Sequence, residues 1–183
     1  MNKSQLAAYA AVALAFTAMG AYVGVQHKQP APVTTAIAPT PGGQPHTAVA
    51  HLYAQTLPDA AGQQHALAQW RGQPLLVNFW ATWCTPCVQE MPELSTLASG
   101  SAKVKVIGIG IDSPSNIAAF AAKYQIAYPL YVAGMTGTDL AREMGNAAGG
   151  LPFTVLIGAD GQVRKTYLGR LKFDQLKADL ARL

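Results

Sequence analysis

The chain has 183 residues, half of them apolar and only 12% charged, with 12 prolines and a formal net charge of +4. Eleven of its 13 basic residues and all nine acidic residues lie from Asp59 onward, so this part carries a net charge of only +2. Such a weak balance argues against a nucleic acid as partner. The roughly 130 residues after position 50 suffice for one hydrophobic core but are too few for two domains.

The N-terminal 25 residues are predicted to form a membrane segment. Residues 6–25 are 20 positions without a charge, about 30 Å of helix, which is enough to cross a bilayer. Lys3 before this run places the N-terminus in the cytoplasm, so the remainder is expected to be exported. The alternative is a signal peptide cleaved near 18–20, which would leave a soluble periplasmic protein. We favour the uncleaved anchor because the apolar run exceeds a usual signal core of about 7–15 residues.

The next segment, 26–50, is predicted to be a flexible linker. It carries five prolines and no acidic residue, and its apolar residues show no helical or alternating period. The folded domain is then expected to occupy 51–183.

The first half of this domain alternates between strand and helix signals. The apolar run 75–80 predicts a buried strand, and a helix follows and ends at Gly100. Residues 103–111 are β-branched and apolar and predict the next strand. Ser113 is a capping residue before a first-turn proline, so a helix is expected over 114–124.

The second half adds a late hairpin. A short strand near 128–132 and a small helix near 138–144 continue the alternation. An Asp-Gly pair between the runs 153–158 and 162–167 is typical of a β-hairpin, and the spacing of apolar residues over 173–180 predicts a closing amphipathic helix. The expected fold class is therefore α/β, with a mixed central sheet flanked by helices on both faces.

The two cysteines of the chain, Cys84 and Cys87, stand where the first strand gives way to its helix. They are compatible with a structural staple, half of a metal site or a redox couple. A crosslink that closes so small a loop stabilises little, and zinc usually needs four ligands, whereas the four histidines lie in or just past the predicted linker. We therefore favour redox chemistry and assign no metal.

A helix start gives the two cysteines different roles. Its unpaired amides and positive dipole end stabilise a thiolate, so we expect Cys84 to be more acidic than a free thiol, whose pKa is about 8.5. Cys84 is therefore the predicted nucleophile. Cys87, one turn further along, is expected to be shielded and to resolve the mixed disulfide. Pro86 fits an early helical position, where its missing N–H costs little.

The motif Trp83-Cys84-Thr85-Pro86-Cys87, with Phe79-Trp80-Ala81 before it, resembles the thioredoxin superfamily, and residues 84–92 are similar to membrane-anchored TlpA-like and ResA-type reductases. The resemblance covers about 51–183. It implies a thioredoxin-like fold and a thiol:disulfide oxidoreductase that reduces exported proteins, as in the maturation of cytochrome c or metalloproteins. It also implies a transmembrane thiol reductase as electron donor and no cofactor beyond the redox-active disulfide.

The resemblance assigns Glu90 as an acid–base group. Glu90 lies three residues after Cys87, on the same side of the helix, where it is placed to exchange protons with the buried thiol. Asn78 stands where ordinary thioredoxins have a buried aspartate, which suggests that the acid–base group has moved. The alternative is a solvated helix carboxylate.

The resemblance also implies a surface that binds the client protein. Pro152 is implied to be cis and to face the disulfide, and the backbone of Leu151 to pair with an extended client segment. Trp83 and Pro86, beside Cys84, are assigned to the same surface. The chain departs from the cytochrome-maturation branch at Phe153, where that branch usually has an acidic residue.

Two rival functions remain open. A peroxiredoxin-like peroxidase needs a threonine three residues before the attacking cysteine, but Ala81 stands there and Thr82 comes one place late. A binding module would instead pass copper between the two cysteines and a histidine without catalysing a reaction.

Overall fold

The computed structural model describes residues 45–100 and 103–183. Six helical segments and seven strands follow one another in this part of the chain: α2 (Pro45–Ala54), β1 (Thr56–Pro58), β2 (Gln64–Ala66), the 3-10 turn η1 (Leu67–Trp70), β3 (Leu75–Trp80), α3 (Thr85–Gly100), β4 (Lys105–Gly110), α4 (Pro114–Tyr124), β5 (Leu130–Val132), α5 (Thr136–Glu143), β6 (Phe153–Ile157), β7 (Val163–Leu168) and α6 (Phe173–Leu180).

A mixed five-stranded sheet forms the centre of the domain, in the order β5-β4-β3-β6-β7. Strands β3, β4 and β5 run parallel, whereas β6 and β7 are antiparallel to their neighbours. The mixed sheet predicted from the sequence is therefore confirmed. The central strand β3 is buried along its whole length, which explains why its sequence is a continuous apolar run rather than an alternating one.

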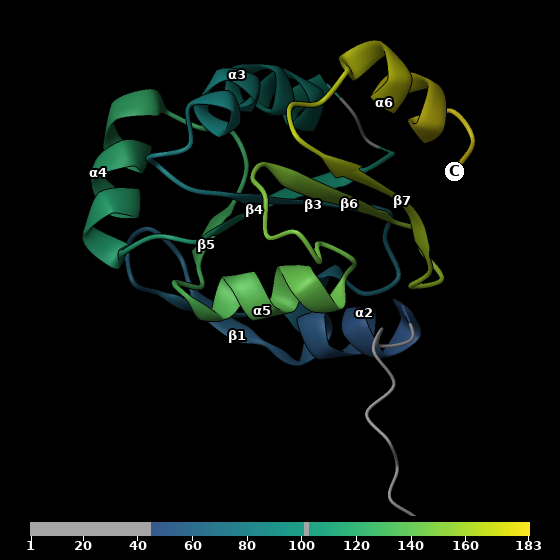
Figure 1. Ribbon diagram of the computed structural model, residues 1–183, viewed down its shortest axis with the longest axis horizontal. Coiled ribbons are helices and arrows are strands. Elements are labelled where there is room, and N and C mark those ends of the chain that lie inside the picture. Colours follow the sequence, from purple (N-terminus) through teal and green to yellow (C-terminus); the bar gives the residue numbers. More distant parts are fainter. Residues whose placement is uncertain (1–44, 101–102) are drawn as a thin grey trace, which may run out of the picture. The chain divides into compact units, whose positions relative to one another are not determined.

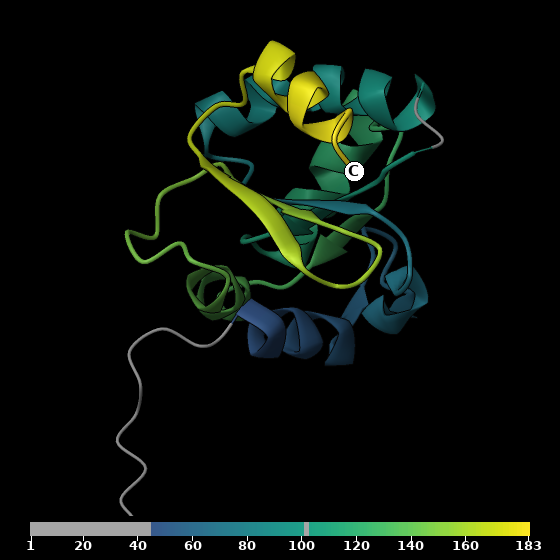
Figure 2. The same ribbon diagram turned by 90° about the vertical axis from the view of Figure 1, so that its right-hand side faces the viewer.

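Helices cover both faces of the sheet, as predicted. Alternate residues of β3 point to opposite sides, so Leu75, Val77 and Phe79 join one core cluster while Leu76 and Trp80 join another. Helices α2 and α5 cover the first cluster, and α3, α4 and α6 cover the second (Figures 1 and 2). Helix α3, which carries the predicted redox pair at its start and is called the redox helix below, thus lies against the face that carries Trp80.

The folded domain begins earlier than the predicted boundary at residue 51. Pro45–Ala54 forms α2, and Ala48, Val49 and Leu52 of this helix are buried under the sheet. These apolar residues recur at helical spacing, and Pro45 occupies the first helical position, where proline is tolerated. The proline-rich composition upstream masked this signal in the sequence.

The predicted membrane segment, 1–25, and most of the predicted linker, 26–44, lie outside the described residues. Within 45–100 and 103–183, none of the helices has the length and apolar character needed to span a bilayer.

Strong local signals placed several elements correctly, and weak ones were missed. Helix α4 has the predicted bounds, and the Ser113 hydroxyl accepts a hydrogen bond from the Asn116 amide at 3.2 Å, as expected of a cap. The short β1–β2 hairpin and η1 were not predicted. Strands of three residues are too short to show a period.

Candidate functional site

Cys84 caps the start of α3. Its N–H donates to the Ala81 carbonyl at 3.2 Å, and its own carbonyl accepts from the Val88 amide at 3.1 Å, which is the first hydrogen bond of the helix. Pro86 follows in the first turn, where a helix leaves amides without internal partners. The sulfur of Cys84 is therefore attached at the positive end of the helix, an environment that favours a thiolate once the bond is reduced.

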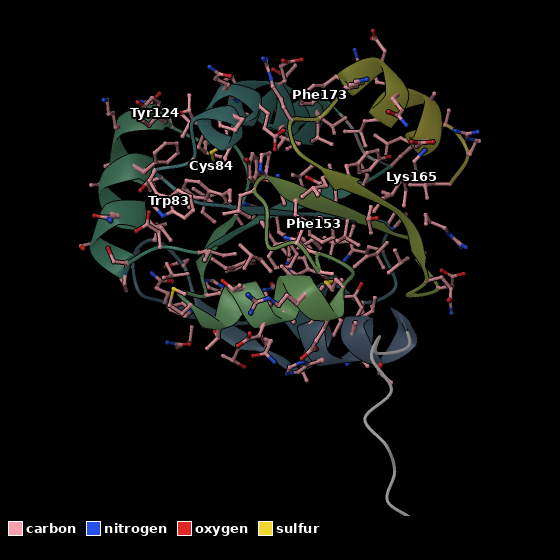
Figure 3. The ribbon with its side chains drawn as sticks, viewed as in Figure 1. Trp83, Cys84, Tyr124, Phe153, Lys165 and Phe173 are labelled. Carbon is pink, nitrogen blue, oxygen red and sulfur yellow. A yellow bond between two sulfur atoms is a disulfide. The ribbon has the colours of Figure 1, made fainter. Side chains whose placement is uncertain are left out.

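Cys84 and Cys87 form a disulfide, and the two residues differ in exposure. Cys84 is 6% exposed, whereas Cys87 is fully buried. Figure 3 shows Cys84 at the end of α3 beside Trp83, which is 68% exposed. An incoming thiolate therefore meets Cys84 first. The predicted division into an attacking and a shielded cysteine agrees with this geometry.

Glu90 is a fully buried carboxyl one turn beyond Cys87. Its Oε1 accepts from the Asn78 amide nitrogen at 2.8 Å, and its Oε2 accepts from the Leu171 backbone N–H at 2.8 Å. Burial raises the pKa of Glu90 to about 7, and these two hydrogen bonds only partly oppose the rise. Glu90 is therefore not the solvated carboxylate of the alternative interpretation, and it exchanges its proton near neutral pH.

The Leu151–Pro152 peptide bond is cis, as the family resemblance implied. The Pro152 carbonyl accepts from the Gly169 amide at 2.8 Å, which fixes the loop against the end of β7. No other described residue hydrogen-bonds to the backbone N–H or C=O of Leu151. This peptide is therefore available to pair with another chain.

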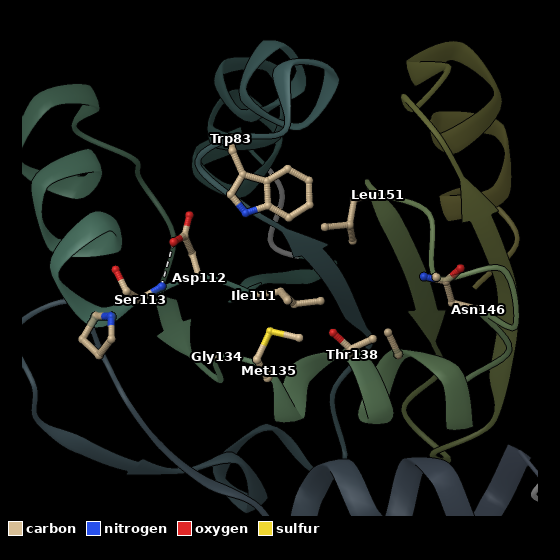
Figure 4. Close-up of a pocket in the computed structure, with 12 residues that line it drawn as sticks. Trp83, Ile111, Asp112, Ser113, Gly134, Met135, Thr138, Asn146 and Leu151 are labelled. Carbon is tan, nitrogen blue, oxygen red and sulfur yellow. Dashed lines mark hydrogen bonds between the residues drawn. The ribbon is translucent and has the colours of Figure 1, made fainter.

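A cavity of about 560 Å³ is lined by Trp83, the residue before Cys84. Trp83 and Leu151 border it on the side of the redox helix, and Met135, which is 79% exposed, borders it on the side of α5 (Figure 4). Sequence reasoning brought Trp83 and Leu151 together through the family resemblance but missed Met135. A sequence pattern gives no indication that the loop before α5 lines the same cavity as Trp83.

Asp112 is a second residue that sequence reasoning missed. Its Oδ2 accepts hydrogen bonds from the N–H of Thr82, at 3.1 Å, and from the Thr82 hydroxyl. Its Oδ1 accepts from the backbone N–H of Ser113 and from the side-chain amide of Asn116, both at 2.7 Å. Asp112 thus joins the loop before Cys84 to the start of α4. Its only signal in the sequence was its place immediately before a capping serine.

Tyr128 completes the buried surroundings of Glu90. Burial raises the pKa of Tyr128 well above its usual value, and the nearby charge of Glu90 raises it further. Its hydroxyl has no hydrogen-bond partner among the described residues. Tyr128 was read from the sequence only as part of a strand, because a tyrosine in an apolar run gives no sign of what its hydroxyl faces.

Comparison with known proteins identifies the family of the chain. The Redoxin family model matches residues 26–180. The thiol-disulfide oxidoreductase ResA of Geobacillus thermodenitrificans is 32% identical over 129 residues, which cover 68% of this chain and 71% of that protein. ResA of Bacillus cereus is 30% identical over 128 residues, 68% of this chain and 72% of that protein.

A solved structure supports the same assignment. A secreted Mycobacterium tuberculosis disulfide oxidoreductase, described as homologous to Escherichia coli DsbE, is 25% identical with a TM-score of 0.61 and covers 73% of this chain and 98% of its own. The structure itself has a cysteine pair at a helix start, a cis-proline and a thioredoxin-like sheet. Together with these similarities, this shows that the chain belongs to the Redoxin family and is a ResA-type thiol:disulfide oxidoreductase of the thioredoxin superfamily.

Proposed function

We propose that this oxidoreductase reduces disulfide bonds of exported proteins on the periplasmic side of a bacterial inner membrane. A transmembrane thiol reductase would return it to the dithiol form. The observation that carries the proposal is the asymmetry of the cysteine pair: Cys84 reaches the surface at a helix start, while Cys87 is fully buried one turn before a carboxyl whose pKa is about 7.

The reaction begins with the reduced domain. The Cys84 thiolate attacks a client disulfide, so that one new S–S bond forms and one client thiolate leaves and takes up a proton. Cys87 then gives its proton to Glu90, and its sulfur attacks the sulfur of Cys84. The Cys84–Cys87 disulfide forms, and the second client sulfur leaves as a thiolate, which takes up a proton from solvent. Two electrons pass to the client, and a dithiol donor must supply two to restore the enzyme.

The client would bind between the redox helix and the cis-proline loop. The backbone N–H and C=O of Leu151, which bond to no other residue within 45–100 and 103–183, suit strand addition by an extended segment of the client. Trp83, two-thirds exposed, offers an apolar surface beside the reacting sulfur. Trp83 and Leu151 line the same cavity, and Pro86 and Pro152 each follow closely in the chain.

Phe153 is the reason why we do not restrict the proposed client to apocytochrome c. This residue is only 3% exposed, and its ring lies 6.0 Å from that of Phe79, centroid to centroid, in the core. It therefore offers the client no charge, and the general reductase is better supported than a role restricted to apocytochrome c.

The cellular location is proposed from the N-terminal sequence and from relatives. The run 6–25 has the length of a membrane anchor, and the similar Mycobacterium tuberculosis oxidoreductase is described as secreted. An anchored domain would meet exported proteins as they fold.

A peroxidase role finds no support at the corresponding position. Ala81 stands three residues before Cys84, and the hydroxyl of Thr82 is engaged by Asp112 rather than directed at the sulfur. Peroxide consumption that depends on Cys84 would reverse this conclusion.

Trapping tests the proposal directly. The Cys87→Ser variant should accumulate mixed disulfides between Cys84 and exported proteins, which mass spectrometry would identify, and the Cys84→Ser variant is the matched control. A redox potential near −250 mV would suit a reductase, whereas about −120 mV would indicate an oxidant. Adducts on Cys87 in the control, or an oxidising potential, would contradict the proposal.

A further inference from the structure

Three fully buried polar side chains meet beneath the redox helix. Asn78 is on β3, Glu90 on α3 and Thr154 on β6, and each has no exposed surface. The amide nitrogen of Asn78 donates both to Glu90 Oε1, at 2.8 Å, and to the Thr154 hydroxyl, at 3.0 Å. Asn78 and Thr154 are also register partners in the antiparallel pair, so the sheet itself fixes their separation.

The two oxygens of Glu90 have partners of different kinds. Oε2 accepts from the backbone N–H of Leu171, a group that can only donate. A carboxyl O–H oxygen is a poorer acceptor than a carboxylate oxygen, so this bond favours placing the proton of a neutral Glu90 on Oε1. That oxygen is the one in contact with Asn78.

The amide of Asn78 can serve Oε1 in both protonation states. In the structure both of its N–H groups are used, and its Oδ1 has no partner among the described residues. Rotation of the amide by half a turn exchanges its donor and acceptor ends. Oδ1 would then accept from a protonated Glu90, and the Thr154 hydroxyl, which can donate as well as accept, would adapt to the reversed amide.

We propose that Asn78 is a positioning residue that holds Glu90 in place both as carboxylate and as neutral acid, by reversing its amide when the proton arrives from Cys87. The inference rests on the proposed function of Glu90 as proton acceptor. An aspartate at position 78, as in ordinary thioredoxins, could not do this beside Glu90, because two carboxylates at this distance cannot both ionise.

Other charged and titratable groups also face Glu90. Arg170, in the loop before α6, favours its ionised form, and Glu93, one turn along α3, opposes it. Tyr128, before β5, stays neutral across the working pH range. None of these three hydrogen-bonds to the Glu90 carboxyl, so the direct side-chain partner among the described residues is Asn78.

Carboxyl and amide NMR of the oxidised full-length chain tests the inference without relying on activity, because disulfide cysteines do not titrate. The side-chain amide resonance of Asn78 should shift with the same pH midpoint as the ¹³C carboxyl resonance of Glu90. An Asn78 resonance that stays constant while Glu90 titrates would overturn the proposed reversal. If the wild-type chain reduced no disulfide, the proposed function would fail, but this measurement would still decide the role of Asn78.

Exchanging the amide of Asn78 and the carboxyl of Glu90 between the two positions gives a second, functional test. In Asn78→Asp we expect the pH midpoint of client reduction to rise by about one unit or more, because one of the two carboxyls must keep its proton. In Glu90→Gln the pH dependence of client reduction that comes from this site should vanish. In the double variant Asn78→Asp/Glu90→Gln a pH dependence should return, because residue 78 then carries the titrating carboxyl. Gln175→Glu, which adds a carboxyl on the exposed surface of α6, is the matched control. An unchanged pH midpoint in folded Asn78→Asp, or no pH dependence in the double variant, would show that Asn78 serves only to pack the core.

Discussion

The carboxylate of Asp112 accepts two hydrogen bonds from Thr82, one from its backbone and one from its hydroxyl, and so joins the loop before Cys84 to the end of β4. Thr82 lies two residues before the reactive cysteine. The same carboxylate also accepts from the first turn of α4. The position of the loop before Cys84 therefore depends on one anionic side chain from the connection between β4 and α4.

Asp112→Asn should loosen this connection. Burial by itself would raise the pKa of Asp112, but the hydrogen bonds from Thr82, Asn116 and Ser113 together lower it, so the ionised form stabilises the fold. We expect a loss of about 1–3 kcal/mol at pH 7, because charge-assisted hydrogen bonds are lost. The loss should shrink as the pH falls through the lowered pKa, where the wild type becomes neutral as well. Urea unfolding at several pH values measures this, with exposed Asp174→Asn as control; a loss independent of pH would contradict it.

Gly108→Ala tests the packing around the buried tyrosine. A Cβ at this position of β4 would lie 2.7 Å from Leu130 Cδ2 and 3.1 Å from Trp80 Nε1. Overpacking of this kind typically costs about 1–3 kcal/mol. Gly100→Ala, at the end of α3, meets no atom within 4 Å and should be neutral or slightly stabilising. Equal stability of the two variants in denaturant unfolding would show that the β4 backbone can move away.

The sequence predicted those parts of the fold that carry strong local signals. Strand β3 was predicted with its observed bounds because a turn precedes a continuous apolar run, and α4 because a capping serine and a proline mark its start. Helix α2 was hidden because proline-rich sequence runs directly into it. The closing helix was predicted from the helical spacing of its apolar residues, and the late hairpin from its Asp-Gly turn.

The candidate site could be predicted where its residues are close in the sequence, but not where folding brings distant residues together. Cys84 and Cys87 lie three positions apart at the start of α3, so their spacing, the strand before them and the lack of further nearby ligands in the sequence indicated their chemistry. The contacts of Glu90 with Asn78 and Leu171 join residues 12 and 81 positions apart. Only the folded chain shows that the carboxyl is buried rather than solvated.

Alkylation of the reduced protein should separate the two thiols. Cys84, at the helix start and partly accessible, is expected to react first and with a pH midpoint below the 8.5 of a free thiol. Cys87, fully buried, should stay protected until the protein unfolds. Mass spectrometry after short exposure to iodoacetamide over a range of pH measures both. Preferential labelling of Cys87 would exchange the two roles.

Glu90→Gln should remove a pH dependence of stability. Because burial raises the pKa of Glu90 from 4.5 to about 7, the folded protein holds this proton more tightly than the unfolded chain does. Stability should therefore fall as the pH rises from about 4.5 to 7, by up to about 3 kcal/mol, and then stay level. Denaturant unfolding of the oxidised wild type and of the variant at pH 5 and pH 8 checks this. A wild type equally stable at both would show that Glu90 titrates normally.

Trp83→Ala should affect clients rather than the fold. Its side chain is mostly exposed, so its loss should change the free energy of unfolding by less than about 0.5 kcal/mol. An aromatic side chain that contacts a bound partner is often worth more than 1 kcal/mol, so we expect kcat/KM for a protein disulfide to fall about tenfold while reduction of a small aromatic disulfide is unchanged. Met135→Ala, across the cavity, tests whether the client extends to α5. Equal losses on protein and small disulfides in Trp83→Ala would assign the tryptophan to the reactivity of Cys84 instead, because only a client with extended contacts can sense the surface beside the sulfur.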